Sequence, residues 1–316
     1  MVKSALQHHG VAVLQAEDDA DCLIVNTAIS VATESGKPAV VVSDDTDVLS
    51  LLVNQAGRTP ANLFQLSQAG KKEPKIYDIS AIRKELGEAA DLILFAHAIS
   101  GTDTTSALYM KGKRDPLKKL MKNDNLRKLA QVFYNTLSSK AEVAAAGEAF
   151  ILTWYGISAP NLDKARYKAY VRQIAKKSVA SKIDLALLPP TSAAAIQHCL
   201  RVYHQVQAWL GRELPAVDWG WKLSPTGLLV PVTTTLLAAP SKVLESIACA
   251  CRGDCSNRIC GCVRASDRCS PMCANCCGQA CSNAMLDVPG GTDLGDYAEQ
   301  ESDPDDPDET EKMKSH

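Results

Sequence analysis

A dense run of cysteines constrains this sequence more than any other feature. Ten of its 12 cysteines lie between positions 249 and 281, in a segment with almost no aliphatic residues. Such a segment has no hydrophobic core to fold around, so metal ions or disulfides must hold it together. Cysteines one residue apart favour zinc, because neighbouring thiolates can converge on one ion or on adjacent ions, whereas thiols this dense rarely all reach disulfide geometry. The predicted ligands are Cys249, Cys251, Cys255, Cys260, Cys262, Cys269, Cys273, Cys276, Cys277 and Cys281.

The number of thiols suggests how many zinc ions they hold. Each zinc takes four ligands, so two ions use eight cysteines and leave two over. Three ions need twelve ligand positions, which nine cysteines supply if three of them bridge two metals. One cysteine is then spare, and Cys276 and Cys277 are the candidates. Nearby arginines can offset the negative charge of the cluster and face a phosphate backbone: Arg252, Arg258, Arg264 and Arg268.

The same segment resembles a known family of zinc modules. Its cysteine spacing, with Gly278 and the closing Cys281-Ser-Asn283, is similar to that of the tesmin-type CXC (CRC) domain. The resemblance implies a cluster of three zinc ions that contacts DNA, and with it a nuclear location. Without that implication the location expected for a reduced, zinc-binding chain is cytoplasmic.

Residues 1–115 predict an α/β domain. The pattern indicates strands at 10–14 and 39–43 on either side of a helix at 18–34, an order that implies a right-handed βαβ unit and a mainly parallel sheet. The β-branched run 39–43 is typical of a strand buried on both faces. Further predictions are a strand at 75–79, a helix at 80–87, and a segment at 91–97 that fits either.

The remainder of the chain divides by composition. Residues 116–222 predict an all-α region, 223–247 a linker, 248–284 the zinc module and 285–316 a disordered acidic tail. The helices expected in the all-α region cover 116–138, 141–155, 163–178 and 192–211. No apolar run approaches the roughly 20 residues that span a bilayer, so no membrane partner is expected.

Acidic residues cluster after three of the predicted elements of the α/β domain. Because ligands bind at the carboxyl ends of strands in such domains, and oxygen-only ligation suits Mg²⁺ or Mn²⁺, the clusters predict a metal site. The alternative is structural, since acids at a helix start complement its dipole and an aspartate such as Asp44 also suits a turn. The candidate ligands are Asp19, Asp21, Asp45, Asp47 and Asp103.

These acidic segments resemble motifs of the flap-endonuclease/XPG branch of PIN-like nucleases. The motifs are Ala16-Glu-Asp-Asp-Ala-Asp21, Val42-Ser-Asp-Asp-Thr-Asp-Val48 and Ser100-Gly-Thr-Asp-Thr-Thr-Ser106. The resemblance implies a PIN-like sheet and a nuclease site with catalytic aspartates at the five positions above. It also implies further aspartates on an earlier strand, so the domain is expected to be incomplete at its N-terminus. In pairing such a domain with a CXC segment, the chain resembles a group of uncharacterised animal proteins. These proteins are often multi-copy, and a link to transposons is one interpretation of them.

A basic stretch follows the last acidic motif. The net charge of the chain is −2, so attraction to a phosphate backbone must be local. Residues 111–128 hold eight basic and two acidic residues, which favours either a nucleic-acid contact or a solvated helix face. The candidate contacts are Lys111, Lys113, Arg114, Lys118 and Lys119.

Two functions are consistent with this sequence. The first is metal-dependent hydrolysis of phosphodiester bonds in nucleic acid, or a remnant of that activity, with the zinc module as a tether to DNA. The second is a non-catalytic DNA- or chromatin-binding protein in which the PIN-like part serves as a scaffold.

Overall fold

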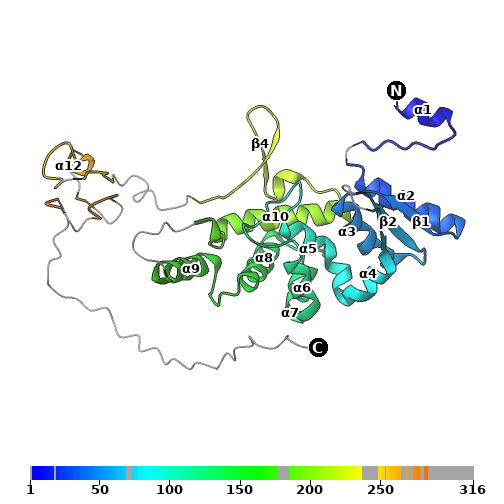
Figure 1. Cartoon of the computed structure of the whole chain (residues 1–316), viewed down its shortest axis with the longest axis horizontal. Helices are drawn as coiled ribbons and strands as arrows, with labels where there is room; N and C mark the ends of the chain where they lie inside the picture. The colour runs from blue at the N-terminus through cyan, green and yellow to red at the C-terminus, as the bar shows by residue number, and fades with distance from the viewer. Residues whose placement is uncertain are drawn as a thin grey trace. The chain divides into compact units, whose positions relative to one another are not determined.

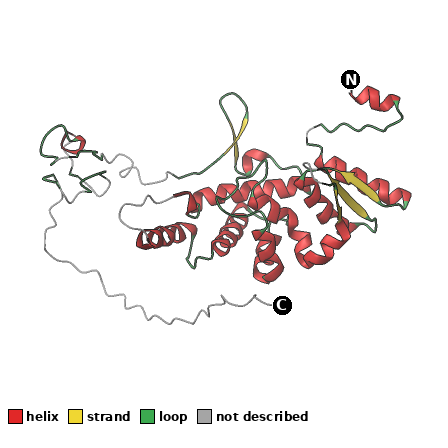
Figure 2. Ribbon diagram, in the orientation of Figure 1, coloured by secondary structure: helices red, strands yellow, loops and turns green. Residues whose placement is uncertain are grey.

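The first of the chain's two units combines a small sheet with a larger group of helices (Figure 1 and Figure 2). The two units are Met1–Ala238 and Ala239–His316. The computed structural model describes residues 2–17, 19–68, 73–176, 185–236, 248–252, 254–264, 268–269, 273–277 and 281–283. The mixed α/β class expected from the sequence is confirmed.

The sheet of the first unit has three strands in the order β1-β2-β3. β1 (Ala39–Val42) pairs with β2 (Leu63–Ser67) in parallel, and β2 pairs with β3 (Lys75–Asp78) in the antiparallel direction. The mainly parallel arrangement of a PIN-like domain is therefore not confirmed. The sequence pattern missed β2, because this short strand mixes apolar and polar residues and is recognisable only from its pairing.

Two expectations about strands were wrong. Residues 10–14 form no strand; Val11 and Leu14 are largely exposed, and the described sheet offers this segment no partner. The β-branched run of β1 is not buried on both faces, since Val41 is buried while Val40 and Val42 are exposed. Side chains alternate between the two faces of a strand, so Val40 and Val42 share one face of β1, and the described residues leave that face largely uncovered.

The first part of the chain contains α1 (Val2–His8), α2 (Asp21–Ser35), α3 (Thr46–Gln55), α4 (Ile79–Leu86) and α5 (Ile93–Ser100), with short 3₁₀ turns η1 (Ala56–Arg58) and η2 (Gly87–Leu92). α2 and α4 pack against the sheet, α3 and η1 connect β1 to β2, and α1 has no buried residue. The ambiguous segment 91–97 belongs to η2 and α5. Every residue of α5 from Leu94 to Ser100 is buried, so its continuous apolar pattern reflects a helix enclosed by other elements rather than a strand.

The helical region continues from α5 and shares its core. It contains α6 (Asp115–Lys122), α7 (Asp124–Gln131), α8 (Lys140–Tyr155), α9 (Leu162–Lys176), η3 (Leu185–Leu187), α10 (Ser192–Trp209) and η4 (Ala216–Asp218). The helix predicted at 116–138 is divided, because Asn123 is extended and its side chain accepts a hydrogen bond from Leu126 N at the start of α7. The predicted end of the helix at 163–178 lies partly outside the described residues.

α10 is the central helix of this region and packs against α8 and α5 (Figure 1). The close approach of α8 and α10 depends on Gly147, since a Cβ atom there would lie 2.2 Å from the Cys199 Sγ. A hairpin of β4 (Trp221–Leu223) and β5 (Leu229–Pro231) follows; it starts at the end of the region predicted to be all-α and continues into the segment predicted to be a linker. Residues 237–247 of that segment lie outside the described part.

The second unit contains the cysteine module. Its described residues form turns and one short helix, α12 (Gly261–Arg264), around a cluster of buried thiols. The acidic tail predicted at 285–316 lies outside the described residues. Among the described helices, none has the length and apolar character needed to cross a membrane.

Candidate metal centres

All five aspartates singled out in the sequence line one pocket of about 520 Å³ in the first unit. They come from three places in the chain: the start of α2, the start of α3 and the loop after α5. Carboxylate oxygens of Asp21, Asp45 and Asp47 lie within 4.8 Å of one another, close enough to share a metal ion. The rest of the pocket is lined by Cys22, Thr102, Thr104, Gln205, Ala208, Trp209 and Glu213.

Local geometry explains the position of Asp45 at the carboxyl end of β1. Asp45 caps α3, because its side chain accepts a hydrogen bond of 2.8 Å from Asp47 N. The buried Gln65 of β2 donates to the backbone oxygens of Ser43 and Asp45 and so fixes the turn between strand and helix. Capping and metal binding are compatible, since a carboxylate has lone pairs for both.

Asp44, next to the pocket in sequence, has a different role. One of its carboxylate oxygens accepts hydrogen bonds from Ser67 Oγ at 2.9 Å and from Gln68 N at 2.6 Å. Asp44 therefore joins the end of β1 to the end of β2, as expected of a turn residue, and does not line the pocket.

The loop that carries Asp103 is held by close backbone contacts. Gly101 has a φ of 110°, and a Cβ atom there would lie 2.7 Å from the Ala107 Cα, so only glycine fits. Thr102 and Thr105 exchange backbone hydrogen bonds across the tip of the loop. Thr104 Oγ1 donates to Gln205 Oε1 at 2.6 Å and ties the loop to α10.

Negative charge is concentrated in the pocket. The pKa of Asp21 is raised from 3.8 to about 6, first because the carboxyl group is partly buried and then because Asp19, Asp45, Asp47 and Asp103 repel its charge. The residues that line the pocket include no lysine or arginine. A cation bound among these carboxylates would relieve their repulsion.

His97 is a neighbour of the site that sequence patterns did not reveal. Its Nε2 lies 2.6 Å from Asp47 Oδ1, and the ring is almost fully buried. Trp209 stacks on that ring at 5.8 Å between centroids, with 17° between the planes. Glu213, in the loop after α10, also lines the pocket and was not predicted from the sequence. No local spacing connects these residues to the aspartates, because only the packing of α10 and α5 brings them there.

The cysteine module buries seven of its ten thiols within the second unit. Three groups of four sulfur atoms lie with all members within 4.8 Å of one another. Cys251 and Cys281 are half-buried, and Cys277 is exposed. The groups are Cys249, Cys262, Cys269 and Cys273; Cys249, Cys255, Cys260 and Cys269; and Cys255, Cys269, Cys276 and Cys281.

Sulfur spacing distinguishes metal ligands from disulfides. The Sγ atoms are 3.7 Å apart in Cys249 and Cys255 and 3.6 Å apart in Cys262 and Cys273. Four thiolates around a zinc ion at about 2.3 Å have sulfur atoms about 3.8 Å apart, whereas a disulfide brings them to about 2.05 Å. The module is therefore compatible with zinc binding, as the sequence predicted, and all ten of its cysteines are free of disulfides.

Backbone hydrogen bonds close the module around its thiols. Ala274 N donates to Cys249 O at 2.9 Å, and Cys269 N donates to Asn283 O at 2.9 Å. The pKa of the Cys260 thiol is lowered to about 6, first by a hydrogen bond from Val263 N, which favours the thiolate that zinc requires. Burial raises the pKa of Cys269 instead, so metal binding at that thiol must displace a proton.

The basic residues singled out in the sequence separate into two groups. Lys111, Lys118 and Lys119 line a pocket beside α6 and α8, whereas Lys113 and Arg114 are exposed and do not line it.

Comparison with known proteins found no matching family model, no matching curated protein and no matching solved structure. The resemblances to PIN-like nucleases and to CXC modules thus stay interpretations of the sequence.

Proposed function

We propose that the acidic pocket binds Mg²⁺ or Mn²⁺ and hydrolyses phosphodiester bonds in nucleic acid, and that the cysteine module binds zinc and tethers the protein to DNA. One observation carries the first part: five aspartates from three separate segments converge on one pocket that no lysine or arginine lines. Such a concentration of like charge is costly in an apo protein and is characteristic of a site for divalent cations.

The proposed roles of the carboxylates follow from their positions. Asp21, Asp45 and Asp47 are close enough to hold one ion. Asp19 and Asp103 line the same pocket and are the proposed ligands of a second, with Glu213 as a further oxygen donor. Bound there, two such ions would activate a water molecule and stabilise the leaving oxygen of a phosphodiester.

Neighbouring side chains support the site. The contact between Asp47 Oδ1 and His97 Nε2 fixes the orientation of the Asp47 carboxylate. Stacking against Trp209 keeps the His97 imidazole in place. Because Ala208 and Trp209 form an apolar side of the pocket, water reaches the carboxylates from fewer directions there.

The zinc assignment rests on how the groups of thiols overlap. Cys249 and Cys255 each belong to two groups and Cys269 to all three, so these are the proposed bridging ligands. If Cys269 bridges only two of the three ions, the ion of the group that shares Cys249 and Cys255 with its neighbours lacks one ligand. The half-buried Cys251, which packs against the cluster, is the proposed fourth ligand of that ion. Nine cysteines then bind three zinc ions. Cys277 is the spare thiol, because it is exposed and belongs to no group.

The tether is proposed from charge. Four arginines of the module are exposed on its surface: Arg252, Arg258, Arg264 and Arg268. Their side chains suit contacts with phosphate oxygens.

One preparation tests both parts. Zinc per chain is counted by mass spectrometry, and the reduced protein is then incubated with flap, single-stranded and duplex DNA and Mn²⁺. We expect three zinc ions, and cleavage that is lost in Asp45→Asn and Asp103→Asn but retained in the matched control Asp44→Asn, whose carboxylate lies outside the pocket. Three zinc ions without Mn²⁺-dependent cleavage would refute the nuclease and leave the DNA-binding alternative. Unchanged DNA affinity after Cys260→Ser and Cys262→Ser would refute the tether.

A further inference from the structure

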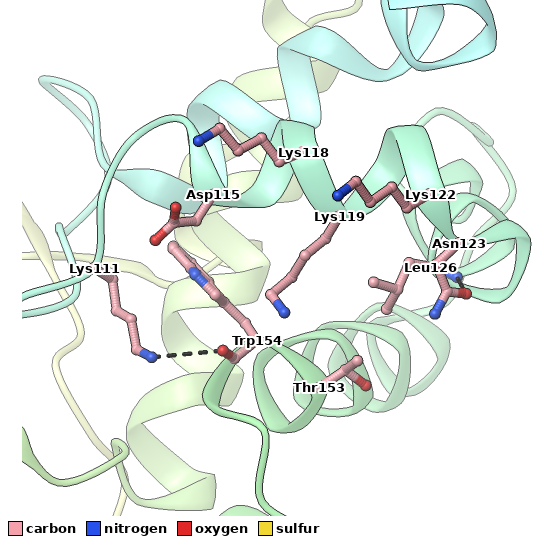
Figure 3. Close-up of a pocket in the computed structure, with 9 residues that line it drawn as sticks. All are labelled: Lys111, Asp115, Lys118, Lys119, Lys122, Asn123, Leu126, Thr153 and Trp154. Carbon is pink, nitrogen blue, oxygen red and sulfur yellow. Dashed lines mark hydrogen bonds between the residues drawn. The ribbon is translucent and has the colours of Figure 1, made fainter. Parts of the chain in front are cut away.

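A second pocket of the first unit, of about 560 Å³, is strongly basic (Figure 3). It lies between the loop before α6, the helix α6 and the C-terminal end of α8. Four ammonium groups and one carboxylate surround it. Its lining residues are Lys111, Asp115, Lys118, Lys119, Lys122, Asn123, Leu126, Thr153 and Trp154.

The protein offsets only part of the positive charge of this pocket, because one carboxylate faces four lysines. Among the described residues, no ion pair involves any of its four lysines. The single carboxylate, Asp115, instead accepts a hydrogen bond from Gly112 N. The pKa of Lys111 is lowered, first by burial and also by the charge of Lys119, although Asp115 acts in the opposite direction. The pocket therefore favours an anion that several ammonium groups can share.

Two hydrogen-bond donors of the pocket are held by their surroundings, the ammonium group of Lys111 and the indole nitrogen of Trp154. Lys111 Nζ donates to Trp154 O at 3.5 Å and lies 4.2 Å from the ring centroid of Tyr155, which holds this lysine at the end of α8 (Figure 3). The indole nitrogen of the buried Trp154 has no acceptor among the described residues. Lys119 and Lys122 extend from α6 on the opposite side (Figure 3). A tetrahedral anion with several oxygen atoms matches such a set of point charges better than a planar carboxylate does.

The acidic and basic pockets are connected by one short loop. Asp103 lines the first pocket and Lys111 the second. Eight residues of extended chain span at most about 28 Å, which is the length of about eight base pairs of duplex. A nucleic-acid strand that enters the acidic pocket can therefore reach the lysines with a phosphate within about eight nucleotides of the cleavage site.

We infer that this lysine pocket binds a backbone phosphate of the nucleic acid whose scissile phosphate lies in the acidic pocket. That the phosphate belongs to a nucleic acid rests on the proposed function. The affinity for phosphate itself rests on the four lysines alone. The pocket holds the nucleic acid in register beside the carboxylates and compensates for the repulsion between their charge and the phosphate backbone.

A binding experiment with the full-length chain tests the inference. Asp45→Asn is used as the background so that cleavage does not interfere, and the affinity for duplex DNA of about 20 base pairs is measured at several salt concentrations. We expect Lys119→Ala with Lys122→Ala to weaken binding about tenfold and to lower the slope of log affinity against log salt by one to two, since each phosphate contact contributes about 0.9. The double variant Lys119→Arg with Lys122→Arg should keep both the DNA affinity and the salt slope, because it keeps the two positive charges.

The matched control removes the same charge elsewhere. Lys128 and Lys164 are exposed and line neither pocket, so their double replacement by alanine should leave the slope unchanged and the affinity within about twofold. Equal effects of the two double variants would overturn the inference. The affinity for inorganic phosphate is measured for the same proteins. A pocket variant that no longer binds inorganic phosphate but keeps its full DNA affinity would also overturn the inference, because the pocket then serves a free phosphate.

Cleavage by the chain with its native Asp45 separates this inference from the proposed function. Pocket-dependent binding without Mn²⁺-dependent cleavage would refute the nuclease but support the phosphate pocket. Cleavage with no dependence of binding on the lysines would support the nuclease but refute the pocket.

Discussion

Replacing Asp21 by asparagine should stabilise the metal-free protein near neutral pH, although it removes a proposed metal ligand. The carboxyl group of Asp21 is half-buried among four other carboxylates, and its pKa of about 6 lies above the ordinary 3.8. The folded state therefore holds the proton more tightly than the unfolded chain does. Asparagine keeps the shape of the side chain without the charge.

The magnitude follows from the pKa difference. At about 1.36 kcal/mol per pKa unit, a rise from 3.8 to about 6 sets an upper bound of about 3 kcal/mol. Asp21 is only partly buried, so solvent screening reduces the expected gain to about 1 kcal/mol.

The sign depends on pH. Below pH 3.8 the carboxyl group is protonated in both states, and the two proteins should be equally stable. As the pH rises from 3.8 through about 6, the unfolded wild-type chain loses its proton first, so the wild-type free energy of unfolding falls relative to that of Asp21→Asn. Above that range the difference should be constant.

Urea unfolding in buffers without added divalent cation, at several pH values, measures this difference. Adding Mn²⁺ should reverse its sign, because a ligand at 100 times its Kd stabilises the wild-type protein by about 2.7 kcal/mol, and the variant binds it less well. Asp44→Asn is the control and should give no gain, since its carboxylate accepts two hydrogen bonds outside the pocket. A variant less stable than wild type at pH 7.5 without metal, or a difference independent of pH, would refute the reasoning.

Three further predictions concern other parts of the chain. His97→Ala should weaken Mn²⁺ binding about 10- to 100-fold in a titration, whereas His97→Gln should retain part of the affinity because it can still donate to Asp47; equal losses would argue against orientation by the hydrogen bond. Gly147→Ala should lower the free energy of unfolding by about 1–3 kcal/mol in urea, because its Cβ would overlap Cys199, while Gly112→Ala, which has only ordinary contacts, should change it by less than about 0.5 kcal/mol. Cys277→Ser should leave the zinc content unchanged and Cys269→Ser should reduce it; a loss of zinc in the first variant would overturn the assignment of the spare thiol.

The chemistry of the two candidate sites was visible in the sequence because it depends on residue types close together in the chain. The density of thiols after Cys249 required metal or disulfides, since the segment has too few aliphatic residues to form a core. The pairs at Asp19 and Asp21 and at Asp45 and Asp47 each occupy a helix start, where local geometry already brings two carboxylates together.

The elements between these sites were less predictable. The run at 93–100 is apolar all round because α5 is enclosed on every side, and a short apolar run fits a strand equally well until its neighbours are known. The missing strand at 10–14 and the unforeseen β2 have the same cause: strands exist through their partners, and pairing is not encoded in either segment alone.

The sequence by itself determined which side chains are available for chemistry: the thiols of one short segment, the aspartates at two helix starts and a loop, and a basic stretch after them. Only the tertiary structure decided that His97 contacts Asp47, that α10 closes one side of the acidic pocket with Trp209, and that the thiol of Cys277 is exposed. These contacts join residues far apart in the chain. They arise because burying the apolar faces of α5 and α10 against one another fixes where the polar side chains at their margins must lie.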